Sequence, residues 1–293
     1  MTEDYAVRAG DAIEADLAAR IAEVYQKALE RAIKNNAEYL RNVKELDARV
    51  EKLKARGWDN KKIEAWRKEE MMKLLREQQV VQNIAEEMNR AGIEITPEIK
   101  ASMVDVYKVN NDMTRQYLNE TVTANFNMTR MPKRQMEIIL NDTQPVFSKI
   151  AYKHLGQNET IRRRLQSEFA QATILGESQE KLIRRIMKVT GQAAYQARRV
   201  AQTERTRTQS QARHDAMHEA AKMGIVVTKE WTCRMVNSRD SHIALNGTKI
   251  PENEKFRSIS GAELEYPGDP TAPAAEVINC HCVLIPGIST PGA

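Results

Sequence analysis

K-E-W-T-C at residues 229–233, R-D-S-H-I-A-L-N-G at 239–247 and I-N-C-H-C-V-L at 278–284 set the end of this sequence apart from the rest. All 3 cysteines of the chain lie in these stretches. The β-branched and aromatic residues up to Cys233 predict one strand, and the residues from Val277 to Ile285 predict a second. A short helix or turn ending at Asn246-Gly247 is expected between them. The sequence therefore predicts a small α+β module over residues 224–293.

The residues before this module carry the spacing of amphipathic helices. Apolar side chains recur every three or four positions from Ile13 to Ala28 and again from Tyr39 to Leu53. Asp59 is expected to cap the N-terminus of a helix, Gly92 to end it, and Thr96-Pro97 to open the next. Gly191 and Gly224 are also expected to end helices. The expected helices span about 11–55, 59–89, 97–123, 132–140, 145–155, 161–175, 179–191 and 192–223.

These patterns predict a mainly α protein, with an extended helical arm and bundle followed by the α+β module. Aromatic residues make up only 5% of the chain and the mean hydropathy is -0.60, which favours long helices with solvated faces over a thick core. We expect three domains: a helical arm and bundle over 1–156, a helical region with a long basic helix over 157–223, and the module with its tail over 224–293.

Charge and cysteine usage narrow the class of protein. The chain has a net charge of +5, whereas residues 224–293 hold 6 Lys and Arg against 8 Asp and Glu, so the positive charge lies in the helical part. This distribution suits a polyanionic partner, or an ordinary solvated helical surface. No membrane segment is expected, because no apolar run approaches the roughly 18 residues of a spanning helix. An acidic start argues against a signal peptide, and an odd number of cysteines favours the reducing cytoplasm over a disulfide framework.

Three motifs over residues 160–285 together resemble a known family. They are G-E-S-x-x-K-L-I-R-R-I at 176–186, A-R-R-V-A-Q-T-E-R-T-R at 197–207, and the ordered set K-x-W, R-D-S-H-x-x-L-N-G and N-C-x-C. In order and spacing they resemble the Mu-F-like family of tailed bacteriophages. Its members are called head morphogenesis proteins or minor head proteins. The resemblance implies no established catalysis.

What the resemblance implies is a low-copy virion protein made in the bacterial host cytoplasm. Such a protein would lie inside the head near the portal vertex. Its expected partners are the phage portal protein, capsid and scaffold proteins, and packaged double-stranded DNA. Its expected work is head assembly, with roles in DNA packaging or delivery.

Four residues of the module form a candidate zinc site: Cys233, His242, Cys280 and Cys282. Structural zinc takes four Cys or His ligands in a tetrahedron. If Cys280 and Cys282 lie on a strand, their side chains face the same side and His281 faces the other. The alternative is that the cysteines are small buried hydrophobes.

The residues around the central turn have a structural and a chemical interpretation. Trp231, Arg239, Asp240, Asn246 and Gly247 are expected to form a network that holds the turn. Asp240 with His242 would alternatively suggest acid–base chemistry, and His242 with Asn246 a metal-dependent nuclease or toxin-like enzyme. Such mechanisms need a second carboxylate or histidine, and the sequence shows none at a recognisable spacing. No catalytic residue is therefore assigned.

Five arginines of the long basic helix form a candidate contact surface: Arg198, Arg199, Arg205, Arg207 and Arg213. They would contact DNA phosphates or an acidic portal surface. The alternative is a solvated face with internal ion pairs, such as Glu204 with Arg207. No helix-turn-helix or zinc-finger spacing is present, so DNA binding by an internal virion protein of this kind would be non-specific.

Overall fold

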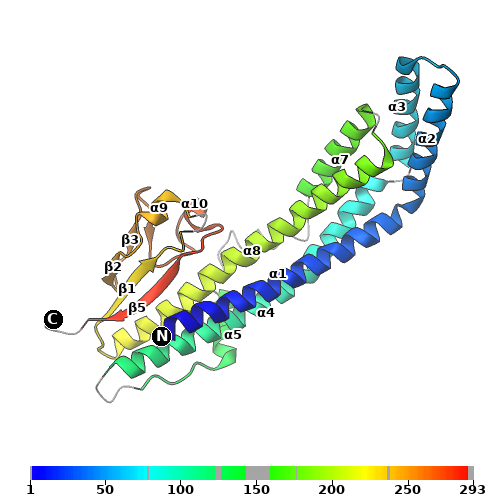
Figure 1. The fold of residues 1–293 in the computed structure, drawn as a ribbon. Coiled ribbons are helices and arrows are strands. Elements are labelled where there is room, and N and C mark those ends of the chain that lie inside the picture. The colour runs from blue at the N-terminus through cyan, green and yellow to red at the C-terminus, as the bar shows by residue number, and fades with distance from the viewer. Residues whose placement is uncertain are drawn as a thin grey trace. The chain divides into compact units, whose positions relative to one another are not determined.

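A computed structural model describes residues 2–77, 79–122, 127–142, 159–175, 177–235 and 238–289 (Figure 1). The predicted class is confirmed, because long helices precede a small region of antiparallel strands. The chain forms two compact units, each built from separate segments. Unit 1 comprises Met1–Ala19, Pro97–Ala151 and Arg198–Ala293, and unit 2 comprises Arg20–Thr96 and Tyr152–Ala197. The three domains expected from the sequence, over residues 1–156, 157–223 and 224–293, remain a prediction.

The described residues of unit 2 form helices and the turns between them, with no strand. Helices α2 and α3 pack as a hairpin whose turn contains Gly57 at φ 75. Asp59 caps α3 as expected, since its Oδ2 accepts a hydrogen bond of 3.2 Å from the Lys62 amide. Tyr39 and Phe169 bring α2 and α7 together, with ring centroids 6.0 Å apart. The helices that contribute to this unit are α1 (Thr2–Asn35), α2 (Ala37–Ala55), α3 (Asn60–Glu77), α4 (Val80–Thr121), α7 (Glu159–Ile174) and α8 (Gln179–Lys222).

Two expected helix ends are wrong. Helix α4 continues through Pro97, and α8 continues through Gly191. Apolar residues on both sides of Pro97 are buried, and the hydroxyl of Thr96 donates to the Gly92 carbonyl at 2.7 Å. A glycine inside a helix costs only about 1 kcal/mol relative to alanine, which the burial around Gly191 outweighs. Packing therefore overrides both local signals.

The remaining boundaries divide between confirmed and wrong predictions. The single helix expected over 11–55 is two helices separated at Asn36, and the helix expected over 59–89 ends at Glu77. Gly224, at φ 90, ends α8 as predicted. The irregular stretch before α5 (Lys133–Asp142) is confirmed in its described part, residues 127–131. The helix expected over 145–155 lies outside the described residues.

The strands of unit 1 form a three-stranded antiparallel sheet in the order β2-β1-β5. Strand β1 (Val227–Thr232) is the centre, pairing with β2 (Lys249–Pro251) and with β5 (Val283–Ile288), in a register that places Thr232 opposite Val283. A separate pair joins β3 (Phe256–Arg257) to β4 (Glu263–Leu264). Helices α9 (Asp240–Ile243) and α10 (Ala274–Val277) are single turns in the connections.

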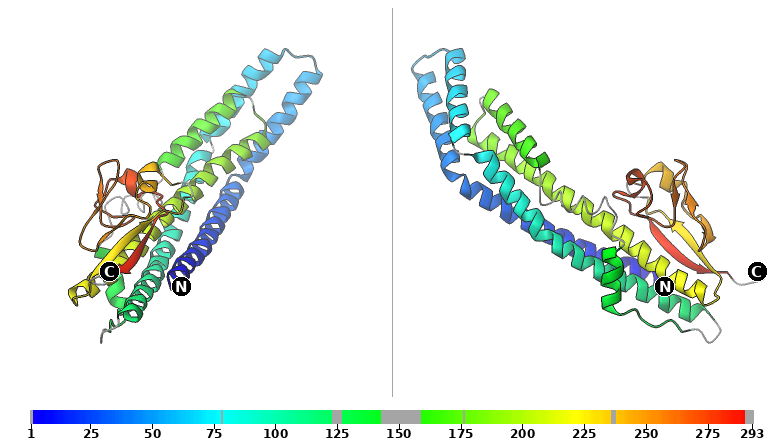
Figure 2. Two further views of the ribbon diagram at one scale, coloured as in Figure 1. Left: turned by 60° about the vertical axis from the view of Figure 1, so that its left-hand side comes forward. Right: turned by 180° about the vertical axis from the view of Figure 1, so that it is seen from behind.

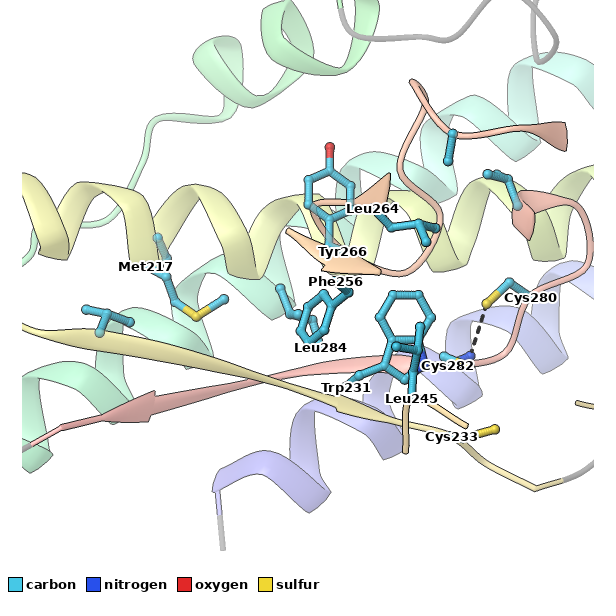
Figure 3. Close-up of a cluster of buried hydrophobic side chains, with 14 of the residues drawn as sticks. Met217, Trp231, Cys233, Leu245, Phe256, Leu264, Tyr266, Cys280, Cys282 and Leu284 are labelled. Carbon is cyan, nitrogen blue, oxygen red and sulfur yellow. Dashed lines mark hydrogen bonds between the residues drawn. The ribbon is translucent and has the colours of Figure 1, made fainter. Parts of the chain in front are cut away.

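The sheet packs on the C-terminal part of α8, as both views of Figure 2 show. Ala216, Met217 and Ala220 of α8 share one hydrophobic cluster with Trp231 and Leu284 of the two long strands. The three cysteines lie together at one end of this cluster, beyond Trp231 (Figure 3). The fold of unit 1 thus places the chemically distinctive residues of the module beside the long basic helix.

A candidate metal centre in the C-terminal module

His242, Cys280 and Cys282 converge on one buried point. The Sγ atoms of both cysteines lie 3.4 Å from Nδ1 of His242. One potential ligand atom from each residue lies within 4.8 Å of the other two. The three residues are only 1%, 3% and 4% exposed, respectively. The structure therefore brings together three of the four ligands that the sequence predicts.

Cys233, the fourth predicted ligand, is buried in the same hydrophobic cluster but lies outside this group of three. Its backbone amide donates to Oδ1 of Asn246 at 2.8 Å. That bond fixes the end of strand β1 against the turn that carries His242.

Cys280 and Cys282 lie in a turn before strand β5. The strand predicted to begin at Val277 therefore begins only at Val283, and the predicted start is wrong. Asn279 at φ 59 turns the chain after α10, and the amide of Cys282 donates to Cys280 Sγ at 3.4 Å. This last bond is the dashed line of Figure 3. A turn with an N–H···S bond directs both sulfur atoms to one side. The alternation of side chains along a strand predicted the same direction, but the backbone here is a turn and not a strand.

Glu276 is a site residue that the sequence analysis missed. Its Oε2 lies 2.9 Å from Nε2 of His242, although this nitrogen is not aligned for a hydrogen bond. Both carboxylate oxygens accept hydrogen bonds from serines: Ser260 Oγ at 2.6 Å and Ser241 Oγ at 2.9 Å. Glu276 lies far from His242 in sequence, and no local pattern could have paired them.

The electrostatics of the cluster shift the pKa values of Glu276, Cys280 and Cys282 in different directions. Burial raises the pKa of Glu276, but hydrogen bonds from Ser260 and Ser241 and the charges of His242 and Arg239 outweigh it, so the net pKa is lowered. Hydrogen bonds from Cys282 and His242 hold the pKa of Cys280 well below its usual value. The same contact with Cys280, together with burial, raises the pKa of Cys282. Contact between the two thiols therefore lowers the pKa of one and raises the pKa of the other.

The predicted turn residues lie around this centre. Arg239 donates to the carbonyls of Ala275 and Ile278, at 2.5 and 2.6 Å, and so holds α10. The amide of Gly247 donates to the carbonyl of Trp231 at 2.8 Å, and the Trp231 indole meets the His242 ring edge-on at 5.0 Å. Asp240 starts α9 and is exposed.

Helix α8 holds the cysteine turn through three side chains that the sequence analysis did not single out. Thr206 Oγ1 and Gln202 Nε2 both donate to the Cys280 carbonyl, at 2.5 and 3.2 Å. Thr203 Oγ1 accepts from the amide of Asn279 at 2.9 Å. The A-Q-T-E-R-T motif and the N-C-x-C motif, far apart in sequence, therefore touch each other.

The five arginines do not form one exposed stripe. Arg198 and Arg199 are exposed, whereas Arg205, Arg207 and Arg213 are each only 2% exposed. Arg205 pairs with Asp11 and Glu14 of α1, and Arg207 with Glu204 at 3.0 Å. Arg213 donates to Asn110 Oδ1 and to the carbonyl of Leu284, at 3.0 and 2.8 Å. The packing of α1, α4 and the module around α8 encloses these three charges.

Comparison with known proteins identifies the region that contains the A-Q-T-E-R-T and N-C-x-C motifs. Residues 163–285 match the family described as Phage Mu protein F like protein. This match covers less than half of the chain. The predicted resemblance is confirmed, and the family indicates a phage head morphogenesis protein and a component of the virion.

Two curated relatives are similar to parts of this chain. NAD(+)–arginine ADP-ribosyltransferase EFV of Enterococcus faecalis is 29% identical over 140 residues, which are 47% of this chain and 28% of that protein. The uncharacterized protein YqbB of Bacillus subtilis is 35% identical over 98 residues, 32% of this chain and 31% of that protein. The matches thus span less than a third of each relative. No solved structure matches.

Within the described residues, no helix is both long enough and apolar enough to cross a membrane.

Proposed function

We propose that this chain is a low-copy minor head protein that binds at or near the portal inside the phage head. There it assists procapsid assembly and the packaging or delivery of DNA. The observation that carries the proposal is the family match over residues 163–285. In this proposal the protein acts by binding, and any zinc it holds has a structural role.

The contacts made by the motif residues support a structural role. Gln202, Thr203 and Thr206 hold the cysteine turn, and Arg239 holds α10. These polar side chains are used to join one segment of unit 1 to another. Residues with such internal duties stabilise a binding surface, whereas a catalytic group must face a substrate.

The test is direct binding of the purified full chain to purified portal, capsid and scaffold proteins, each measured separately by native mass spectrometry. We expect a complex with the portal at fixed stoichiometry, and a low, constant copy number in isolated heads. Binding to capsid or scaffold but not to portal would contradict the portal location. Absence of the chain from heads would contradict the whole proposal.

A second candidate, an enzyme, is favoured by the match to the ADP-ribosyltransferase of Enterococcus faecalis. The matched part is only 28% of that protein, so enzymatic activity is a proposal for this chain. The enzyme class also includes the metal-dependent nuclease or toxin-like module considered from the sequence. The tests are NAD⁺ consumption with an arginine acceptor and DNA cleavage. An activity that the full chain shows, and that a folded His242→Ala variant loses, would favour the enzyme. We expect neither activity.

A non-specific DNA-binding role is compatible with the head protein proposal, but the structure leaves it little of the predicted surface. Of the five candidate arginines, Arg198 and Arg199 are exposed and the other three are buried in internal pairs. DNA contact through this part of α8 would therefore rest on two charges.

A further inference from the structure

The two sulfur atoms around His242 exceed what one imidazole nitrogen can bind through hydrogen bonds. Nδ1 has one in-plane position for a hydrogen bond, as donor or acceptor according to the tautomer, so it bonds one sulfur atom at a time. Yet Sγ of Cys280 and Sγ of Cys282 lie at the same 3.4 Å from it. A common bonding partner placed between the three atoms would satisfy all of them.

The spacing of the three atoms fits a tetrahedral metal ion. Zinc binds thiolate sulfur at about 2.3 Å and imidazole nitrogen at about 2.0 Å, which places the two ligand atoms about 3.5 Å apart at the tetrahedral angle. The observed Sγ–Nδ1 distances are 3.4 Å for both cysteines. The side chains therefore need little movement to take up an ion.

Glu276 supplies the second feature expected of a metal-binding histidine. Such a histidine commonly directs its other ring N–H to a carboxylate, which fixes the tautomer and the ring orientation. Glu276 lies 2.9 Å from Nε2 of His242 and is itself held by Ser241 and Ser260. A proton on Nε2 leaves the Nδ1 lone pair directed at the two sulfur atoms.

We infer that His242 Nδ1, Cys280 Sγ and Cys282 Sγ bind one zinc-class ion, with Glu276 as the residue that orients His242 and Cys233 as the fourth ligand. The soft sulfur ligands and the imidazole suit zinc, whereas magnesium and calcium prefer oxygen. Binding converts each ligating thiol to a thiolate and releases its proton to solvent. No oxidation or reduction takes place.

Cys233 is assigned the fourth position because the site is closed to solvent. Structural zinc sites use four protein ligands, and the three converging residues are buried. Cys233 is buried in the same hydrophobic cluster. It stands outside the group of three, so a rotation of its side chain is required.

The consequence of metal binding reaches helix α8. Cys280 carries one ligand on its side chain, and its carbonyl accepts hydrogen bonds from Gln202 and Thr206. Ion binding would therefore fix the turn that α8 contacts, and would stabilise the α+β module on this helix. This inference does not depend on the portal, because it concerns the isolated chain.

The test is the metal content of the full chain, purified without chelator and with zinc in the medium. We expect one zinc per chain by inductively coupled plasma mass spectrometry, and a lower unfolding temperature after chelation. Cobalt(II) substitution should give the absorption bands of a tetrahedral thiolate site. A chain that folds yet binds neither zinc nor cobalt would overturn the inference.

Matched variants locate the ion. Cys280→Ser with Cys282→Ser should abolish binding, and His281→Asn, between them in the turn, should leave it unchanged. Glu276→Gln should weaken zinc affinity by about 10- to 100-fold while keeping the cobalt spectrum, which a ligand change would alter. Cys233→Ser should remove one thiolate from that spectrum. A spectrum unchanged in the Cys280/Cys282 double variant would overturn the site, and one unchanged in Cys233→Ser would overturn the fourth ligand.

Discussion

Gly268 lies so close to Arg207 that a Cβ atom added to it would be 2.8 Å from Cα and 2.9 Å from the amide nitrogen of Arg207. Gly268 also has a φ of 82, which residues other than glycine rarely adopt. The loop before the cysteine turn therefore packs directly on the backbone of α8. The Y-P-G-D-P sequence at 266–270 can make this approach only with glycine at its centre.

Gly268→Ala should lower the free energy of unfolding by at least about 3 kcal/mol, because it combines a strained φ with a clash against the helix backbone. Chemical denaturation measures the change. Gly261→Ala is the matched control, since Gly261 has a φ of 85 but no atom within 4 Å of the added Cβ. The control should lose only about 1–2 kcal/mol. Equal losses in the two variants would show that the close approach is absent.

Arg213→Ala should destabilise the protein by about 3 kcal/mol. The substitution leaves two acceptors in the interior, Asn110 Oδ1 and the Leu284 carbonyl, without the guanidinium that bonds them. Arg199→Ala, an exposed arginine of the same helix, should change stability by less than about 0.5 kcal/mol. Thermal and denaturant unfolding of both variants would test the difference, and a neutral Arg213→Ala would disprove the buried role.

His214 should make the protein less stable as the pH falls from about 6.5 to about 4. Burial, with the nearby charge of Lys229, lowers the pKa of His214 to about 4 from 6.5. Between these values the unfolded chain binds a proton that the folded chain does not, so stability is complete above pH 6.5 and is lost below it. The full effect is on the order of 3 kcal/mol.

His214→Gln should remove this part of the pH dependence when denaturation is measured across the same range. His218→Gln is the control, because His218 also contacts Glu252, at 3.1 Å, but its side chain is 52% exposed. Wild type and His218→Gln should show the same slope. A slope that persists in His214→Gln would assign the pH dependence to other groups.

Charge reversal at Arg198 and Arg199 should have a small effect on DNA affinity and none on folding. Each phosphate contact adds roughly 0.9 to the slope of log affinity against log salt. Two exposed arginines can therefore account for a slope of at most about 2. Titration of duplex DNA at several salt concentrations measures it for wild type and Arg198→Glu/Arg199→Glu. An unchanged slope in the variant would show that Arg198 and Arg199 do not contact the phosphates.

The sequence by itself determined the helical class, the position of the α+β module, the cap at Asp59, the stop at Gly224 and the three residues that converge in the candidate metal centre. These features depend on local backbone preference and on side-chain periodicity, which a short window of sequence contains. His242, Cys280 and Cys282 stood out because few residue types bind metal ions.

Only the tertiary structure decided which polar residues are enclosed. Arginines of a long helix are usually solvated, yet the segments packed on α8 bury Arg205, Arg207 and Arg213. Glu276 meets His242, and Thr206 meets Cys280, only because loops distant in sequence close on the same helix. Burial around Pro97 and Gly191 likewise keeps α4 and α8 unbroken. Burial is a property of the surroundings of a residue, and those surroundings come from distant segments of the chain.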